Sequence, residues 1–240
     1  PYLKEQGYEV HTVMVNTGGF SAEEEKAIEE RAMKLGAASH KNVNAVNTYY
    51  EKGIRYLIYG NILKNATYPL SVSSERVFQA LEVLKQVKAI GADAVAHGST
   101  GAGNDQVRFD IVFEILAPSV EIIAPVREHG FTRQYEIDFL QQHGFDFTWE
   151  KGKYSINQGL WGTSIGGVET LSSDGYLPEE AYPTKVTKTE PEHIKIGFRK
   201  GEPVSFNGVE MNPVDVIKAV RDAAAPFGIG REIHIRDTII

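Results

Sequence analysis

The chain has no cysteine among its 240 residues, which excludes disulfide frameworks, thiolate metal sites and cysteine nucleophiles. It also lacks an apolar run of the length that crosses a bilayer. No basic stretch followed by an apolar core and a small-residue cleavage site opens the chain, so no secretory signal is recognised. These absences are compatible with a cytoplasmic protein that has no membrane partner.

An excess of basic residues is missing too. The formal net charge is −7, with acidic and basic residues interspersed, so there is no stripe that a nucleic-acid backbone requires. No His, Asp or Glu spacing on one helix suggests a metal cage, and we assign no metal ligand. With 42% hydrophobic and 24% charged residues, the composition is that of a globular chain with one domain or one domain plus part of another.

Short apolar strands alternate with amphipathic helices through the first 150 residues. The strands are expected at residues 8–15, 93–97 and 120–124, and the helices at residues 21–36, 48–62, 74–90 and 105–117. Ser21 and Glu24 form a capping-box pair, and Thr48 and Glu51 repeat that spacing, which favours helix over strand for the YLIY segment. The alternation predicts an α/β fold with a doubly wound parallel sheet, whose ligands gather where strands end and helices begin.

Two further patterns concern packing and the ends of the chain. Val107, Ile111 and Ile115 recur along one side of the helix at 105–117 and predict its buried stripe. Residues 2–7 have the pattern of a helix end closed by a glycine C-cap, and residues 239–240 that of a strand. We therefore expect a chain that is truncated at both ends.

Glycine, serine and proline become frequent after Lys151, and long regular periodicity stops. This predicts two domains, residues 1–150 and residues 151–240. In the second, residues 193–199 alternate and can pair with residues 203–206, and residues 213–227 form a helix with proline at its start. The second domain is expected to be α+β and incomplete.

A glycine-rich turn carries the chemistry. The segment HGSTGAGNDQVR, residues 97–108, leaves a predicted strand through three glycines and enters a helix, so its backbone N–H groups can converge on an anion. It has neither the lysine of a Walker A loop nor the third glycine of the dinucleotide fingerprint. The loop alone does not identify a ligand.

Charged residues at the start of the following helix indicate which kind of ligand the turn binds. Arg108 in the first turn opposes the helix dipole, and Asp105 beside a phosphate cradle would repel phosphate. A zwitterionic ligand reconciles the two, because the guanidinium can bind a carboxylate while Asp105 accepts hydrogen bonds from an ammonium group. Asn104 projects with them. A capped helix with a local surface ion pair is the open alternative.

Several motifs together resemble one family. HGSTGAGNDQVRF is similar to the signature of argininosuccinate synthases, and other similar motifs run in family order along nearly the whole chain. They are YPLSVSSER at 68–76, APVRE at 124–128, YSINQGLWGTS at 154–164, EEAY at 179–182 and FGIGR at 227–231. On these motifs the chain is identified as a member of that family.

The resemblance implies an ATP-dependent ligase. Family members join citrulline to aspartate, release AMP and pyrophosphate and form argininosuccinate, in the penultimate step of arginine biosynthesis and in the urea cycle. It implies ATP as co-substrate, Mg²⁺, a cytoplasmic location and a homotetramer at full length. Residues 1–150 would be an adenine nucleotide alpha hydrolase-like ATP-pyrophosphatase domain without its N-terminal Ser-Gly-Gly-x-Asp loop, and residues 151–240 part of a synthetase domain. The 240 residues alone are therefore expected to lack part of the catalytic apparatus.

The resemblance also carries over site residues. Those matching ATP contacts are Val15, Ala96, His97, Gly98, Ser99, Thr100, Gly101, Ala102, Gly103 and Asn104. Those matching aspartate contacts are Thr100, Asn104 and Asp105, of which Asp105 is the catalytic candidate. Those matching citrulline contacts are Tyr68, Ser73, Asn104, Arg108, Ser155 and Ser164. Without the resemblance, Tyr68 reads as a packed turn aromatic, Ser73 or Ser74 as a helix N-cap, and Trp161 as either pocket or core.

Two rival functions remain at this point. One is another ATP-pyrophosphatase, such as an amidotransferase synthetase or a tRNA-modifying ligase, which would lack the segment from Ser155 to Ser164. The other is a nucleotide-binding or interaction fragment without catalysis.

Overall fold

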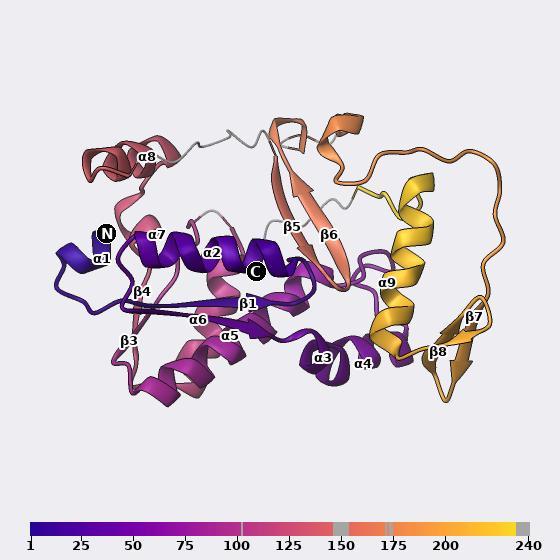
Figure 1. Cartoon of the computed structure of the whole chain (residues 1–240), viewed down its shortest axis with the longest axis horizontal. Helices are drawn as coiled ribbons and strands as arrows, with labels where there is room; N and C mark the ends of the chain where they lie inside the picture. Colours follow the sequence, from indigo (N-terminus) through magenta and orange to yellow (C-terminus); the bar gives the residue numbers. More distant parts are fainter. Residues whose placement is uncertain (102, 146–153, 171, 173–174, 234–240) are drawn as a thin grey trace. The chain divides into compact units, whose positions relative to one another are not determined.

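A computed structural model describes residues 1–101, 103–145, 154–170, 172 and 175–233 (Figure 1). The chain forms two compact units, each built from two stretches of sequence. The first comprises Pro1–Ala45 and Ser73–Glu150, and the second Val46–Val72 and Lys151–Ile240. The expected change of character near Lys151 and the strand expected at residues 239–240 lie outside the described residues. No helix in the described ranges is long and apolar enough to cross a membrane.

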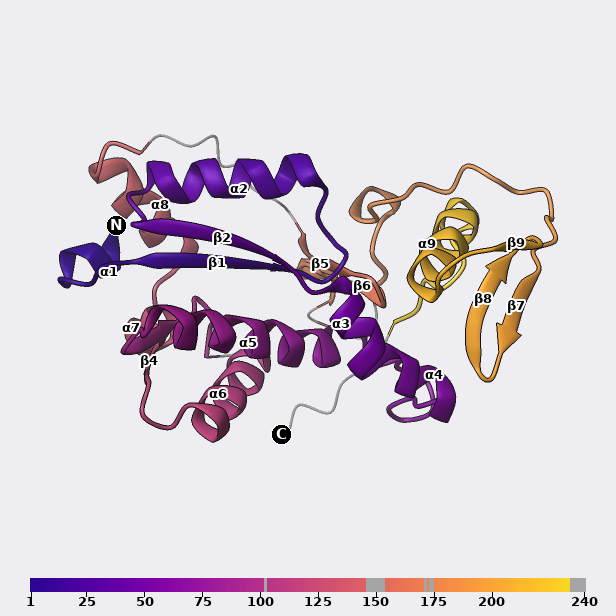
Figure 2. The same ribbon diagram turned by 60° about the horizontal axis from the view of Figure 1, so that its bottom comes forward.

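The first unit is α/β. Its elements are α1 (Tyr2–Glu5), β1 (His11–Asn16), α2 (Ala22–Lys34), β2 (Ser39–Asn44), most of α5 (Ser71–Ile90), β3 (Ala94–Ala96), α6 (Asp105–Leu116), β4 (Glu121–Ile123), α7 (Pro125–His129) and α8 (Arg133–Gln142). β1 pairs with β2 and β3 pairs with β4, both in parallel. Within the described residues these pairs are separate two-stranded sheets. Figure 2 shows α2 along one side of the β1–β2 pair and α5 on the other.

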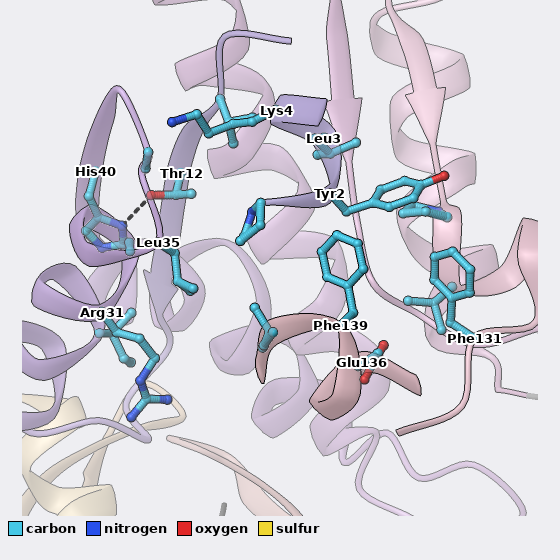
Figure 3. A pocket seen from close by; sticks show the side chains of 18 of the residues that line it. Tyr2, Leu3, Lys4, Thr12, Arg31, Leu35, His40, Phe131, Glu136 and Phe139 are labelled. Carbon is cyan, nitrogen blue, oxygen red and sulfur yellow. Dashed lines mark hydrogen bonds between the residues drawn. The ribbon is translucent and has the colours of Figure 1, made fainter. Parts of the chain in front are cut away.

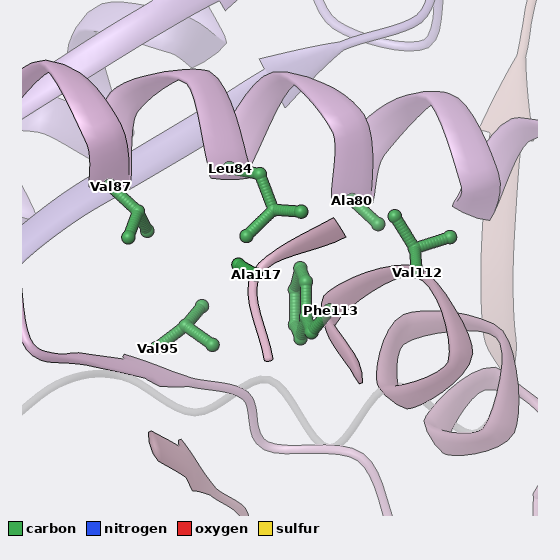
Figure 4. Packing of buried hydrophobic residues seen from close by; sticks show 7 residues of the cluster. All are labelled: Ala80, Leu84, Val87, Val95, Val112, Phe113 and Ala117. Atoms are coloured by element: carbon green, nitrogen blue, oxygen red, sulfur yellow. The ribbon is translucent and has the colours of Figure 1, made fainter. Parts of the chain in front are cut away.

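The core of the first unit lies where α5, α6 and β3 meet (Figure 4). Ala80, Leu84 and Val87 of α5 are buried, and Val77 and Leu81 pack partly buried against them, whereas Ile90 is 51% exposed. The remaining members of the buried cluster are Val95, Val112, Phe113 and Ala117. This packing fixes the two ends of the glycine-rich turn, because β3 precedes the turn and α6 follows it.

Local signals account for several element boundaries. Ser21 caps α2 with the predicted capping box, in which its hydroxyl accepts from the Glu24 N–H and the Glu24 carboxylate accepts from the Ser21 N–H. Gly91 adopts a positive φ of 66° directly after α5, a left-handed conformation that glycine adopts readily. α1 is likewise followed by Gly7, with φ 90°.

Two sequence-based predictions are corrected, and one strand was not predicted. The buried stripe of α6 is not Val107, Ile111 and Ile115: the latter two are 49% and 70% exposed, while Val112 and Phe113 are buried. Phe113 supplies more apolar area than either isoleucine, so the helix turns that side to the core. The polar strand β2 was not predicted, since SHKNVN lacks an apolar alternation. Finally, no capping box forms at Thr48, because that residue lies inside α3.

The second unit contains a helical stretch, a hairpin and a small antiparallel sheet. Its elements are α3 (Val46–Tyr49), the π-helix η1 (Tyr50–Ile54), α4 (Arg55–Gly60), β5 (Ser155–Gly159), β6 (Gly162–Gly166), the 3-10 turns η2 (Val168–Thr170) and η3 (Glu179–Ala181), β7 (Ile196–Arg199), β8 (Glu202–Phe206), β9 (Val209–Glu210), α9 (Pro213–Ala224) and η4 (Ala225–Phe227). The predicted β7–β8 hairpin turns at Lys200 and Gly201, both with positive φ, as a two-residue hairpin loop favours.

Helix α4 is tied to β8 within this second unit by one shared carboxylate. Glu202 accepts hydrogen bonds from Arg55 Nε at 2.9 Å and from the Tyr50 hydroxyl at 3.1 Å. Burial and the bond to Glu202 raise the pKa of Tyr50 to about 12. The phenol therefore stays protonated and keeps donating across the physiological pH range.

The core of the first unit gives a test of the corrected α6 face. Phe113→Ala should lower the free energy of unfolding by about 3–5 kcal/mol, because it leaves a cavity between α5 and α6. Ile115→Ala on the same helix should change it by less than about 0.5 kcal/mol, since that side chain is exposed. Urea denaturation followed by circular dichroism measures both, and a larger loss for Ile115→Ala would contradict the placement.

Candidate functional site

The glycine-rich turn is anchored at its start by His97. The N–H of Ser99 donates to His97 Nδ1 at 3.3 Å, and His97 Nε2 lies 2.9 Å from a carboxylate oxygen of Asp110 on α6. Because Nδ1 accepts, the proton of the neutral ring sits on Nε2 and is donated to Asp110. The resemblance matches His97 to an ATP contact, and in the structure this bond of its side chain ties the loop to the following helix.

A second tie comes from α7. Arg127 pairs with the other oxygen of Asp110 and donates to Gln106 Oε1 at 3.0 Å. Gln106 in turn donates to the carbonyl oxygen of Gly101 at 2.6 Å. Burial alone would raise the pKa of Asp110, but the hydrogen bonds from Arg127 and His97 outweigh burial and hold the pKa below its ordinary value. The turn is therefore held by charged groups from α6 and α7.

Asp105 lies between two arginines. Arg108 Nη1 donates to one carboxylate oxygen at 2.5 Å, and Arg76 Nε from α5 donates to the other at 3.0 Å. The Arg76 and Arg108 side chains are only 12% and 19% exposed. The predicted proximity of Asp105 and Arg108 is confirmed. The arrangement goes beyond the surface ion pair of the alternative interpretation, because a third, largely buried charge from another helix takes part.

A fourth charged residue, Glu75, contacts Arg76. Glu75 is 3% exposed, and its carboxylate accepts from Arg76 Nη1 at 3.0 Å and from the side chain of Thr17, which follows β1. Burial raises the pKa of Glu75 even though Arg76 and Thr17 pull it down. Glu75 and Arg76 thus link the end of β1 to the start of α6.

Residue-level reasoning missed Glu75 and Arg76. Both stand in the motif YPLSVSSER, which was used only for the resemblance. The available signal was a pair of opposite charges at adjacent positions near the start of an amphipathic helix. Adjacent helical residues do not face each other in an ideal helix, so the contact depends on the bending of the long arginine side chain around its neighbour.

Ser73 is a buried hydroxyl within α5. That helix begins at Ser71, so neither Ser73 nor Ser74 is the N-cap that the simpler interpretation expected. The Ser73 Oγ atom is buried and has no hydrogen-bond partner among the described residues. Buried polar atoms without partners are uncommon in native proteins. Ser73 is close to Arg76 in sequence, and its hydroxyl is a candidate for contact with a ligand.

The remaining candidates of the first unit lie in the glycine-rich turn or at the ends of β1 and β3. Val15 is buried within β1 and Ala96 is the last residue of β3. Gly98, Thr100, Gly101 and Gly103 are exposed, and Asn104, at the N-cap of α6, makes no side-chain capping bond. Ala102 lies outside the described residues. An uncapped helix start and exposed glycine amides leave donors for an anion.

The second unit contains Tyr68, Ser155, Ser164 and Trp161. Ser155 on β5 and Ser164 on β6 share one face of a hairpin, because Ser164 is opposite Asn157, two residues after Ser155. Trp161 in the hairpin turn donates from Nε1 to the carbonyl oxygen of Pro69 at 2.9 Å, which ties the hairpin to the segment beginning at Tyr68. Trp161 is therefore an anchor of that segment.

A cavity of the first unit lies away from these candidates. It has a volume of about 540 Å³ and is lined mainly by apolar side chains from α1, β1, α2, α7 and α8, without any of the site candidates. Figure 3 shows Tyr2, Phe131 and Phe139 turned toward one another, with ring centroids 5.4 Å apart for Tyr2 and Phe131. A polar, phosphorylated ligand does not match this lining. No group of three or more potential metal ligands occurs in the described part of the chain.

Family models match both parts of the chain. Residues 1–146 match the argininosuccinate synthase N-terminal HUP domain. The chain belongs to the argininosuccinate synthase family. Residues 154–240 match the C-terminal domain of the same family. The α/β fold expected from the strand and helix alternation is thereby confirmed as a HUP domain followed by the family's C-terminal domain.

Relatives in archaea and bacteria are similar along the whole chain. Argininosuccinate synthases of Methanocaldococcus jannaschii and Pyrobaculum aerophilum are 40% and 38% identical over 98% of this chain. That of Xylella fastidiosa is 36% identical over all of it. The chain spans about 60% of the length of these relatives. The resemblance first read from motifs is confirmed at the level of the family.

The anchoring of the turn predicts a pH-dependent stability. Asp110→Asn should lower the free energy of unfolding at neutral pH by about 2 kcal/mol, because two charge-assisted hydrogen bonds are lost. The pKa of Asp110 is depressed in the folded state. The deficit should therefore be complete above the unfolded pKa and vanish as the pH falls through the lower folded value. Thermal unfolding of the parent and the variant, followed from about pH 7 to about pH 2.5, measures this difference. The range spans the ordinary aspartate pKa of about 3.9. A deficit that persists at the acid end would contradict the assignment.

Proposed function

We propose that this chain is part of an argininosuccinate synthase, which joins citrulline to aspartate at the expense of ATP and releases AMP and pyrophosphate. The observation that carries the proposal is the Asp105 carboxylate, held between Arg76 and Arg108 at the end of a glycine-rich turn. An acid flanked by two guanidinium groups matches an amino-acid zwitterion better than it matches a phosphate alone. Family membership selects the two amino acids.

In this proposal the turn and the helix start divide the substrates between them. The exposed amides of the turn bind ATP, with Val15 at the adenine and the segment from Ala96 to Asn104 along the nucleotide. Thr100, Asn104 and Asp105 hold aspartate. Arg108, Asn104 and Ser73 hold citrulline, and the buried Ser73 hydroxyl, which has no hydrogen-bond partner among the described residues, supports that assignment. The family resemblance alone assigns Tyr68, Ser155 and Ser164 to the remaining citrulline contacts.

The reaction has two displacement steps. The ureido oxygen of citrulline attacks the α-phosphorus of ATP and pyrophosphate leaves. The amine of aspartate then attacks the activated ureido carbon and AMP leaves. Neither step forms a bond to the protein, so the chain contributes positioning and charge. An ammonium group cannot attack until it loses a proton, and Asp105 is our candidate for orienting the amine and accepting that proton.

Mg²⁺ accompanies the nucleotide in this proposal. The described residues offer no cluster of three or more metal ligands, whereas Mg²⁺ in nucleotide sites is commonly held by phosphates, water and only one or two carboxylates. The ion therefore belongs to the ATP substrate. It would neutralise charge on the phosphates, while arginines and backbone amides of the chain hold the organic groups.

The same family assignment supports proposals on the domains, the oligomeric state and the location of the enzyme. We propose residues 1–150 as the ATP-pyrophosphatase domain and residues 151–240 as part of the synthetase domain, with a homotetramer at full length. We further propose a cytoplasmic enzyme in the penultimate step of arginine biosynthesis, where the urea cycle uses the same reaction.

Asp105→Ala in a full-length enzyme that carries this sequence tests the proposal. We expect formation of argininosuccinate to fall by at least about a thousandfold, in the range seen when a principal catalytic group is lost, while ATP binding is retained. A coupled assay of AMP and pyrophosphate measures turnover, and calorimetry measures ATP binding.

Asp93→Ala is the matched control, because Asp93 is an exposed acid ahead of β3 and lies outside the charge cluster. It should keep parental activity. AMP formation by the parent without citrulline, or with ammonia in its place, would favour another ATP-pyrophosphatase. Undiminished activity of the Asp105 variant would remove Asp105 from the mechanism.

A further inference from the structure

Gln106 contacts the glycine-rich turn but has no part in the substrate contacts proposed above. It lies in the first turn of α6, and its side-chain amide joins two groups. Its Nε2 atom donates to the carbonyl oxygen of Gly101 at 2.6 Å, and its Oε1 atom accepts from Arg127 Nη1 at 3.0 Å. The Arg127 side chain runs beside the turn, since its Cγ atom lies 3.5 Å from the position that a Cβ atom at Gly101 would occupy. The Gln106 amide therefore connects the turn to α7.

The two partners leave this amide one orientation. A guanidinium can only donate hydrogen bonds, and a backbone carbonyl can only accept them. The amide oxygen of Gln106 must therefore face Arg127, and its NH2 group must face the Gly101 carbonyl. Arg127 is itself paired with the Asp110 carboxylate. The hydrogen bond to Gly101 thus has a fixed direction, because a flipped amide would place its oxygen against the carbonyl oxygen.

The turn leaves backbone donors open while this carbonyl is engaged. The N–H groups of Thr100, Gly101 and Gly103 have no hydrogen-bond partner within the described residues, and these three residues are exposed. Such N–H groups are available to an anion. A carbonyl oxygen that faced the same anion would repel it. Glycine tolerates many backbone conformations, so the Gly101 carbonyl needs a partner that keeps it in one direction.

We infer that Gln106 is a positioning residue, which holds the Gly101 carbonyl beside α7 and leaves the N–H groups of the turn to bind the phosphates of ATP. The inference rests on the proposed function, in which this turn binds the nucleotide. Without the hydrogen bond from Gln106, the Gly101 carbonyl can turn toward the phosphates. Binding of ATP is then weakened, whereas citrulline, whose proposed contacts do not include Gly101, is unaffected.

The test is Gln106→Met in a full-length argininosuccinate synthase that carries this sequence. Methionine keeps the length of the side chain and is a good helix former, but it cannot donate to the Gly101 carbonyl. We expect the KM for ATP to rise about tenfold, the upper end for the loss of one hydrogen bond. The kcat and the KM for citrulline should change less than about twofold, because only binding of the nucleotide is affected. A coupled assay of pyrophosphate release measures these constants.

Gln106→Glu is the second variant. Its carboxylate can still accept from Arg127, but at neutral pH it has no proton to donate to the Gly101 carbonyl. The KM for ATP should rise again, and by more than in Gln106→Met, because the added charge also repels phosphate. A rise in the glutamate variant without one in the methionine variant would be an effect of charge alone and would overturn the inference.

Gln134→Met is the matched control. Gln134 on α8 donates from its side-chain amide to Asp138 at 2.8 Å, so the same kind of hydrogen bond is lost away from the turn. Its kinetic constants should be parental. The inference is also overturned if Gln106→Met raises the KM for citrulline as much as that for ATP and lowers the midpoint of thermal unfolding, since that indicates a purely structural role. A parent enzyme without citrulline-dependent formation of AMP contradicts the proposed function itself, which is a separate result.

Discussion

The sharing of the Asp105 carboxylate by Arg76 and Arg108 is the interaction on which the site depends. It joins α5 to α6 and fixes the first turn of α6, where the glycine-rich turn ends. Its two arginine side chains are largely removed from water, so their attraction to the carboxylate is stronger than between fully exposed surface charges. A site of this kind has its charges in place before a ligand arrives, and this reduces the reorganisation needed at the moment of reaction.

The surrounding structure holds this cluster from three directions. The apolar packing of α5 against α6 and β3 fixes the helices that carry Arg76 and Asp105. The contacts of Asp110 with His97 and Arg127 hold the turn from the side of α6 and α7. Glu75 and Thr17 connect the cluster to the end of β1. Each of these three sets of contacts restrains a different part of the site, and rigid elements hold polar side chains in place in this way.

The sequence was most informative where one short-range pattern decides the structure. The Ser21 capping box and the β7–β8 hairpin depend on residues only a few positions apart, and both are confirmed. The nearness of Asp105 and Arg108 is of the same kind. Motifs in family order then identified the family, which spacing alone could not have done.

Predictions failed where distant residues decide. The buried face of α6 depends on whether Phe113 or the isoleucines meet α5, which no local pattern specifies. β2 is polar and exists because β1 supplies its hydrogen bonds. Arg76 reaches Asp105 from 29 positions away in sequence. These features depend on contacts between elements that are far apart in sequence, so they can be identified only from the tertiary structure.

A crystal structure of the chain soaked with aspartate tests the central claim most directly. The account predicts that the aspartate ammonium lies within hydrogen-bond distance, about 2.7–3.0 Å, of an Asp105 oxygen, with Asn104 and Thr100 in contact with the same molecule. Aspartate bound elsewhere, with Asp105 still shared only by Arg76 and Arg108, would contradict it.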